Sequence, residues 1–190
     1  MREDGGVNPY RFSDCISRTI TTTTFKRKID LIHSFFLMQS DTTFVIDLEQ
    51  GEAVERRLAV LLVQRGRHKA VDKVTGYCKE YDLVADNGER YEVKFDRYAM
   101  EKRSTNLAFE YFYQGKPSDI STTPAQFWAH YDGTFFYILA VAPFKDWIVM
   151  NKLYLRKVKS GVGAQSILIP SKSLCGLYFC DMIRDVASVA

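Results

Sequence analysis

One segment, residues 81–95, constrains the fold of this chain more than any other. Its centre reads Asp86-Asn87-Gly88, a sequence that favours a tight turn because asparagine and glycine tolerate the left-handed backbone conformation. Apolar and polar residues alternate on both sides of this turn, as they do in strands whose two faces meet different surroundings. The segment therefore predicts a β-hairpin, and the fold must include a sheet built around it.

The length of the turn decides which side chains of the hairpin share a face. A two-residue turn would pair Asp82 with Val93, whereas a three-residue turn, with Gly88 in a bulge, pairs Asp82 with Glu92. The second register places the large apolar side chains on one face, namely Tyr81, Leu83, Tyr91, Val93 and Phe95. Because a slip of one residue would scatter this set, we predict the three-residue turn.

In this register two carboxylates, Asp82 and Glu92, lie directly opposite each other, and Lys94 lies opposite Glu80. A solvated face with a cross-strand ion pair would account for Glu80 and Lys94. It does not account for two facing carboxylates, which destabilise a sheet unless a cation lies between them. Magnesium prefers oxygen ligands and keeps several of its waters, so it suits such a pair. The hairpin therefore predicts a divalent-metal site.

A third carboxylate, Glu55, lies on the helix predicted over residues 47–65. Asp47 is expected to cap this helix and Arg65-Gly66 to end it. Glu55 lies at the edge of the apolar stripe that is formed by Val54, Leu58, Leu61 and Leu62. Two interpretations stay open: Glu55 reaches water or an arginine such as Arg56 or Arg57, or it joins the hairpin carboxylates in one site.

The remaining patterns complete a mixed α/β chain. Residues 25–38 have helical spacing, and Thr123-Pro124 favours the start of a short helix that reaches residue 131. We expect an N-terminal arm and helix over 1–40 and one domain over 41–190. The other predicted elements are strands near 69–74, 77–85, 90–96, 107–113, 135–141, 148–158 and 167–169 and a final helix capped by Ser171.

Composition excludes several classes of protein. The longest apolar runs, such as residues 135–142, are shorter than the roughly 18 residues that a membrane span needs, and no apolar stretch near the start predicts a signal peptide. The four cysteines have no Cys-x-x-Cys spacing, which indicates reduced thiols in a cytoplasmic protein. No nucleotide-binding glycine loop is present, and the net charge of +3 permits a nucleic-acid partner.

These motifs resemble a known family. Gly51-x-x-x-Glu55 on a helix, then Asp82, nine residues, and Glu92-x-Lys94 is similar to the PD-(D/E)XK nuclease superfamily, in particular its Holliday-junction-resolvase-like and phage-type branch. Residues 115–123, before an aromatic segment, also resemble that branch, although Tyr81 stands where the family name has proline. The resemblance covers residues 48–141. It implies a restriction-endonuclease-like mixed central sheet flanked by helices, an αβββαβ core, with an N-terminal helical extension.

The resemblance also implies an activity, the hydrolysis of DNA phosphodiester bonds with magnesium, or with manganese in its place. It implies that Asp82 and Glu92 ligate the metal together with the Val93 carbonyl, and that Glu55 holds the metal or its water. Lys94 would orient or help to activate the attacking water, and it stays protonated because carboxylates surround it. The expected substrate is branched DNA, such as a four-way junction. A phage- or prokaryote-type homodimer would cut it, with residues 35–38 or the N-terminal arm at the dimer contact.

Basic and hydroxyl side chains on either side of the hairpin are candidates for phosphate contacts, which give affinity without sequence specificity. They are Arg56, Arg67, Lys69, Lys73, Arg97, Lys102, Arg103, Lys116, Ser121 and Thr122. Glu110 is compatible either with a lysine partner or with an outward position on its strand. Two other functions stay open: a non-catalytic nucleic-acid-binding or scaffold protein on the same fold, and an RNA endonuclease, which usually has a histidine ligand.

Overall fold

The computed structural model describes residues 26–76, 80–159 and 163–185. The chain divides into two compact units, Met1–Phe44 and Val45–Ala190, and each is described by itself. In the first unit the description covers only the helical backbone of residues 26–44. The arm predicted at the N-terminus and the side chains of residues 35–38, which were expected to form a dimer contact, lie outside the described residues.

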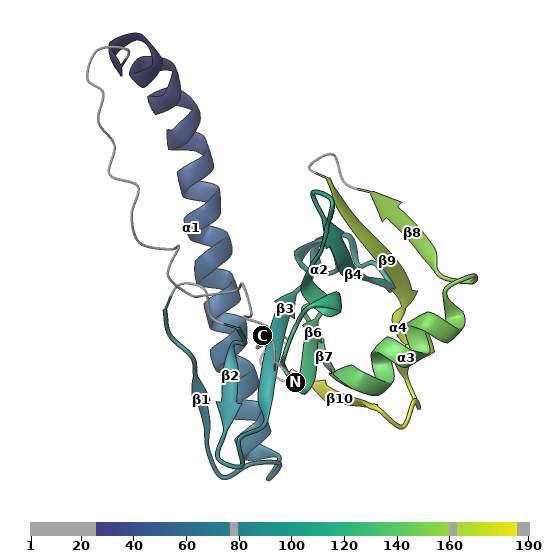
Figure 1. Ribbon diagram of the computed structural model, residues 1–190. Helices are drawn as coiled ribbons and strands as arrows, with labels where there is room; N and C mark the ends of the chain where they lie inside the picture. Colours follow the sequence, from purple (N-terminus) through teal and green to yellow (C-terminus); the bar gives the residue numbers. More distant parts are fainter. Residues whose placement is uncertain (1–25, 77–79, 160–162, 186–190) are drawn as a thin grey trace, which may run out of the picture. The chain divides into compact units, whose positions relative to one another are not determined.

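Helix α1, Lys26–Gln64, is continuous over 39 residues (Figure 1), so the prediction of separate helices over 25–38 and 47–65 is wrong. The interval between them contains no glycine or proline to interrupt a helix. Asp47 is therefore not a cap, and its Oδ1 accepts a hydrogen bond of 2.6 Å from Arg97 Nη1. The predicted end is confirmed, because Gly66 follows with φ +68°. Neither α1 nor another described helix has a stretch apolar enough to span a bilayer.

The second unit contains a six-stranded mixed sheet in the order β1-β2-β3-β6-β7-β10, so the coarse α/β prediction is confirmed. β3 and β6 run parallel, and the other neighbouring strands are antiparallel. The strands are β1 Val71–Lys73, β2 Leu83–Ala85, β3 Arg90–Phe95, β6 Phe127–Tyr131, β7 Phe135–Ala140 and β10 Cys180–Arg184.

The β2–β3 hairpin has the predicted register. Leu83 pairs with Tyr91, as the three-residue turn requires, and Gly88 closes that turn with φ +83°. The N–H of Asp82 donates to the Tyr91 carbonyl at 2.9 Å, which continues the pairing beyond the end of β2. Asp82 therefore lies opposite Glu92.

A second, four-stranded antiparallel sheet, in the order β5-β4-β9-β8, was not expected as a separate sheet. The strands predicted near 107–113 and 167–169 exist but belong to it. Its strands are β4 Asn106–Tyr113, β5 Lys116–Pro117, β8 Arg156–Lys159 and β9 Ala164–Pro170. The short helices of the unit are α2 Arg97–Lys102, the 3-10 turn η1 Asp119–Ser121, α3 Val141–Asn151 and α4 Ser171–Leu174.

Two further predictions are wrong. No helix forms over residues 123–131; residues 127–131 are strand β6, which is enclosed between β3 and β7 and nearly all buried. A strand buried on both faces does not alternate between polar and apolar residues. The spacing of its aromatic residues is therefore compatible with a helix as well as with a strand. The strand predicted over 148–158 is instead the end of α3, a turn and β8.

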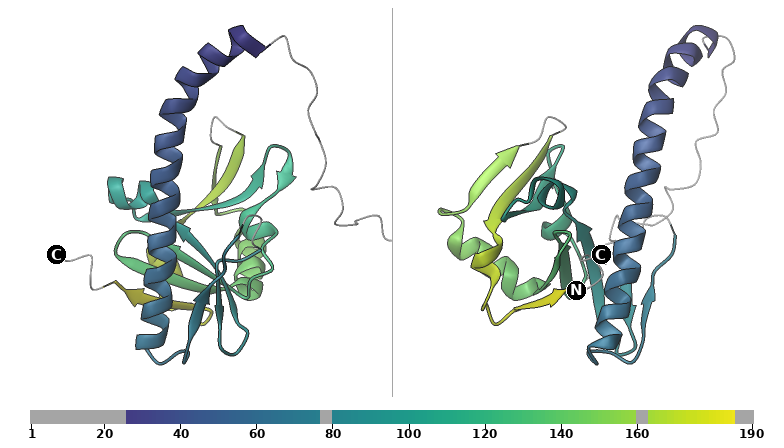
Figure 2. Two further views of the ribbon diagram at one scale, coloured as in Figure 1. Left: turned by 90° about the vertical axis from the view of Figure 1, so that its left-hand side faces the viewer. Right: turned by 180° about the vertical axis from the view of Figure 1, so that it is seen from behind.

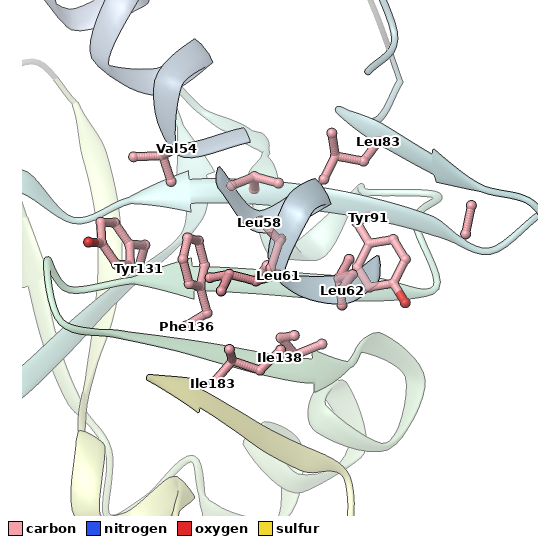
Figure 3. Close-up of a cluster of buried hydrophobic side chains, with 13 residues drawn as sticks. Val54, Leu58, Leu61, Leu62, Leu83, Tyr91, Tyr131, Phe136, Ile138 and Ile183 are labelled. Atoms are coloured by element: carbon pink, nitrogen blue, oxygen red, sulfur yellow. The ribbon is translucent and has the colours of Figure 1, made fainter. Parts of the chain in front are cut away.

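The six-stranded sheet is covered on both faces by apolar layers. Figure 2 shows the backbone of this sheet and of the elements around it in two further views. On one face it packs against residues 54–62 of α1 (Figure 3), and the second sheet and α3 cover the other face. The first layer includes Val54, Leu58, Leu61, Leu62, Leu83, Tyr91, Tyr131, Phe136, Ile138 and Ile183. The second includes Leu107, Phe109, Trp128, Tyr137, Leu139, Phe144, Ile167 and Ile169.

Replacing Gly88 with alanine is expected to destabilise the protein by about 1 kcal/mol, because its φ of +83° lies where a Cβ is strained. Gly51→Ala, inside α1, is the matched control. No atom lies within 4 Å of a Cβ added at Gly51, so this change should stabilise the protein by about 0.5–1 kcal/mol. Urea unfolding of both variants checks the prediction, and effects of the same sign would contradict it.

Candidate active site

Glu92 and Lys94 project from β3 on the sheet face that is turned away from α1. The intervening Val93 packs in the apolar layer under α1, so strand alternation sends its two neighbours to the other side. Lys94 Nζ lies 3.4 Å from Glu92 Oε1. Asp82 is buried opposite Glu92, and its Oδ2 accepts the N–H of Val93 at 2.7 Å. The structure thus brings Asp82, Glu92 and Lys94 together.

Asp119 joins this group from η1, although the sequence did not single it out. Its Oδ1 lies 3.2 Å from Lys94 Nζ, so Lys94 bridges Glu92 and Asp119. Asp119 has a φ of +43°, which is uncommon for a residue with a side chain and is often found at functional sites. The only signal in the sequence was the segment 115–123, whose pattern did not show which side chain would point toward the hairpin.

The charges of the group shift the ionisation of its members. Burial, reinforced by the facing carboxylate of Asp82, raises the pKa of Glu92 to about 7. Burial opposes the charged form of Lys94, but the carboxylates of Asp119 and Glu92 outweigh it and hold the pKa of Lys94 above its ordinary value. The protein alone therefore has a protonated lysine beside a glutamate that is only partly ionised at neutral pH.

A cavity of about 440 Å³ opens beside these side chains. Its walls combine acidic groups from the hairpin and η1 with the hydroxyls of the segment that leads to β6. The lining residues are Glu80, Glu92, Asp119, Thr122, Thr123 and Pro124. A cavity of this size accommodates a small ligand such as a phosphodiester group with its waters.

Trp128 and His130 support Lys94 from the neighbouring strand β6. Lys94 Nζ lies 5.7 Å from the centre of the Trp128 ring, a distance at which the ring face attracts a cation. His130 is buried next to Lys94 in the sheet and bonds Asp96 Oδ2 at 3.1 Å. Asp96 also accepts the N–H of Ala99 and so caps α2. His130 therefore has a structural partner, in a strand and not in the predicted helix.

Glu55 is 7% exposed, and its Oε2 lies 3.4 Å from Lys73 Nζ on β1, the strand next to β2. The two arginines considered as its partners are engaged elsewhere: Arg56 with Glu52 at 3.2 Å and Arg57 with Asp185 at 2.7 Å. Glu55 thus does not simply reach water, and its part in a metal site stays a prediction.

The residues predicted to contact phosphates fall into two groups. Four of them form ion pairs inside the protein: Arg56 and Lys73 with Glu52, Arg67 with Asp181, and Arg97 with Asp47 and Glu101. The others are exposed, namely Lys69, Lys102, Arg103, Lys116, Ser121 and Thr122. Of these, Thr122 lines the cavity beside Glu92, whereas the Ser121 hydroxyl donates to the Tyr111 carbonyl at 2.9 Å. Glu110 accepts from the Ser118 hydroxyl at 2.8 Å, not from a lysine.

Within the described ranges, no three His, Cys, Asp or Glu side chains are grouped so that they could complete a metal site by themselves. Asp82 and Glu92 form a pair of carboxylates, so the shell of any metal here would need main-chain, water or substrate oxygens as well. Magnesium commonly accepts such a shell, with one or two carboxylates and several waters. The donor set thus fits magnesium.

No family model, curated protein or solved structure matches this chain.

Proposed function

We propose that this chain is a metal-dependent endonuclease that hydrolyses phosphodiester bonds in DNA. The observation that carries the proposal is the hairpin register, which sets Asp82 against Glu92 with Lys94 beside them. Two facing carboxylates are costly in a sheet that serves only as scaffold, whereas they suit the binding of a divalent cation.

The order of the strands supports a restriction-endonuclease-like core. After α1, the strands β1, β2 and β3 form an antiparallel meander, and β6 then pairs parallel with β3. This order agrees with the αβββαβ pattern that the motifs resemble. The departure lies in the connection from β3 to β6, which runs through α2, β4, β5 and η1 instead of one long helix.

The residues proposed to hold magnesium are Asp82 and Glu92, with the Val93 carbonyl as a further candidate; Glu55, which lies on α1 beside Lys73, would act through a water of the metal. When bound, the metal would act as a Lewis acid and would activate water for attack on phosphorus; manganese has the same preference for oxygen. The raised pKa of Glu92 supports this assignment. Burial and the facing Asp82 carboxylate raise that pKa, and a bound dication would offset the repulsion between the two carboxylates.

The other side chains position the substrate. Lys94 is protonated, so it does not accept a proton; it would hold the attacking water and offset negative charge on the phosphate. Asp119 would fix Lys94 in place through their 3.2 Å ion pair. The Thr123 hydroxyl, on the cavity wall, accepts the N–H of Ala125 at 3.2 Å and is suited to donate to a phosphate oxygen, whereas the Thr122 hydroxyl donates to the Asp119 carbonyl at 3.4 Å.

The resemblance extends the proposal to branched DNA and to two copies of the chain acting together. The test compares cleavage of a labelled four-way junction with cleavage of matched duplex, single-stranded DNA and RNA, in magnesium and in EDTA. Magnesium-dependent, symmetric cuts in the junction are the expected result. Cleavage of RNA alone would overturn the DNA assignment, and tight binding without cleavage would favour a scaffold protein.

Replacing Lys94 with alanine is expected to slow cleavage by roughly 100-fold, because one charge that stabilises the transition state is lost. Affinity for DNA in EDTA should change by less than about 2-fold, since most of the affinity comes from other phosphate contacts. Lys172→Ala, on the exposed part of α4, is the matched control and should leave the rate unchanged. Equal rates for Lys94→Ala and the control would show that Lys94 has no part in the reaction.

A further inference from the structure

A second cavity, of about 350 Å³, is lined by residues of α3, β8, β9 and the end of β4. Figure 1 labels these elements. The turn η1 borders both cavities: Asp119 lines the one beside Glu92, and Ile120 and Ser121 line this one. A nucleic-acid strand bound in the candidate active site would therefore need to cross only η1 to reach the second cavity.

The walls of this cavity are apolar and its cations are lysines. Tyr111, Ile148 and Val149 contribute to the walls. Lys145, Lys152 and Lys157 also line it, and no described lining residue is acidic. Lys145 Nζ lies 3.3 Å from the Ser121 carbonyl, which directs this cation toward η1. The cavity suits a ligand with an apolar body and negative charge at its edge.

The surface around the cavity is also both apolar and basic. The loop that leads from α3 to β8 leaves Leu153 and Tyr154 85% and 87% exposed. β8 is an edge strand whose exposed side chains are Arg156, Lys157 and Lys159. Exposed aromatic and apolar groups among cations are the surface on which single-stranded nucleic acids stack their bases and place their phosphates.

We propose that this cavity receives an unpaired nucleobase, with the neighbouring phosphates on Lys145, Lys152 and Lys157. The proposal rests on the proposed function for the path of the strand, because η1 joins the cavity to Lys94 and Asp119. It would make unpaired nucleotides, such as those at the branch of a DNA substrate, the feature that the protein recognises. Continuity with the cavity of the proposed nuclease site, whose carboxylates would repel an acidic peptide, favours nucleic acid as the occupant.

The test uses Val149→Trp, which fills the cavity from a side chain that is 62% exposed, so the fold should tolerate it. Met150→Trp is the matched control, because Met150 is the next residue, is 72% exposed and does not line the cavity. Binding of a short fluorescent oligothymidylate is measured by anisotropy in EDTA, together with binding of the same strand made of abasic nucleotides.

Val149→Trp should weaken binding of the oligothymidylate about 10-fold, and Met150→Trp should change it by less than about 2-fold. The wild-type protein should also bind the abasic strand about 10-fold more weakly than the oligothymidylate, which is the same loss that Val149→Trp should cause. Equal binding of both strands by the wild-type protein, or no effect of Val149→Trp, would overturn the proposal. So would binding of a short polyglutamate peptide that Val149→Trp abolishes while DNA binding persists.

These measurements involve no cleavage, so they separate the two proposals. If the protein binds in a base-dependent way but cuts no nucleic acid, the proposed nucleobase site is supported and the proposed nuclease activity is refuted. If the protein cleaves DNA with magnesium but binds the abasic strand and the oligothymidylate equally, the nuclease activity is supported and the nucleobase site is refuted.

Discussion

Glu92→Gln is expected to slow DNA cleavage strongly while it stabilises the metal-free protein above neutral pH. The amide keeps the size of the side chain but removes a negative charge proposed to bind the metal. Loss of that ligand should slow cleavage by roughly 1,000-fold, which corresponds to about 4 kcal/mol of transition-state stabilisation.

The gain in stability follows from the pKa of Glu92, which is raised from 4.5 to about 7 in the folded protein. Between these values the folded state binds more protons than the unfolded chain, so the free energy of unfolding falls as pH rises. The total loss by about pH 8 is at most about 3 kcal/mol. Glutamine does not ionise, so Glu92→Gln should exceed the wild-type protein in stability at about pH 8, by about 1–3 kcal/mol, and this gain should shrink near pH 5.

Urea unfolding in EDTA at the two pH values measures this difference, and magnesium adds a second readout. Magnesium should stabilise the wild-type protein, because a ligand that binds only the folded state raises its stability, and should not stabilise Glu92→Gln. Glu49→Gln, an exposed glutamate on α1, is the control and should change neither cleavage nor stability. If Glu92→Gln destabilised the protein at both pH values, Glu92 would be a structural partner of Lys94 and not a ligand.

The hairpin could be predicted because its information is local. The left-handed Gly88 sets the turn length, and the alternation of Leu83, Tyr91 and Val93 sets the register, so Asp82 and Glu92 followed without knowledge of the rest of the chain. The core residues of α1 followed in the same way from their helical spacing.

The rest of the site depends on contacts between segments far apart in the sequence. Asp119 reaches Lys94 across 25 residues, through a turn with an unusual backbone conformation that no sequence spacing indicates. The sequence of strand β6 was interpreted as a helix because both faces of the strand are buried, so its residues do not alternate between polar and apolar. Arg97 looked available for phosphate, but it binds Asp47 from α1 at 2.6 Å. Spacing identifies a charged side chain, but not the partner that the fold supplies.

Trp128→Ala is expected to destabilise the protein by about 3–5 kcal/mol, the range found when a large buried aromatic side chain is removed. Trp128 is 1% exposed and lies in the apolar layer between the two sheets, where its ring centre is 6.4 Å from that of Phe109. Its loss would leave a cavity beneath Lys94, and the lysine would also lose the ring that its ammonium faces.

Trp147→Ala is the matched control, because Trp147 is a partly buried tryptophan at the edge of the same layer, with its ring centre 6.3 Å from that of Phe144. It should cost about 1–2 kcal/mol, since water can enter the space that it leaves. Urea unfolding, followed by the fluorescence of the remaining tryptophan, compares the two variants. Trp128→Phe keeps a ring at the position and should retain both the fold and most of the cleavage. If both variants lost the same free energy of unfolding, the prediction would be wrong. The packing of Trp128 between the sheets would then contribute no more to stability than the packing of Trp147 at their edge.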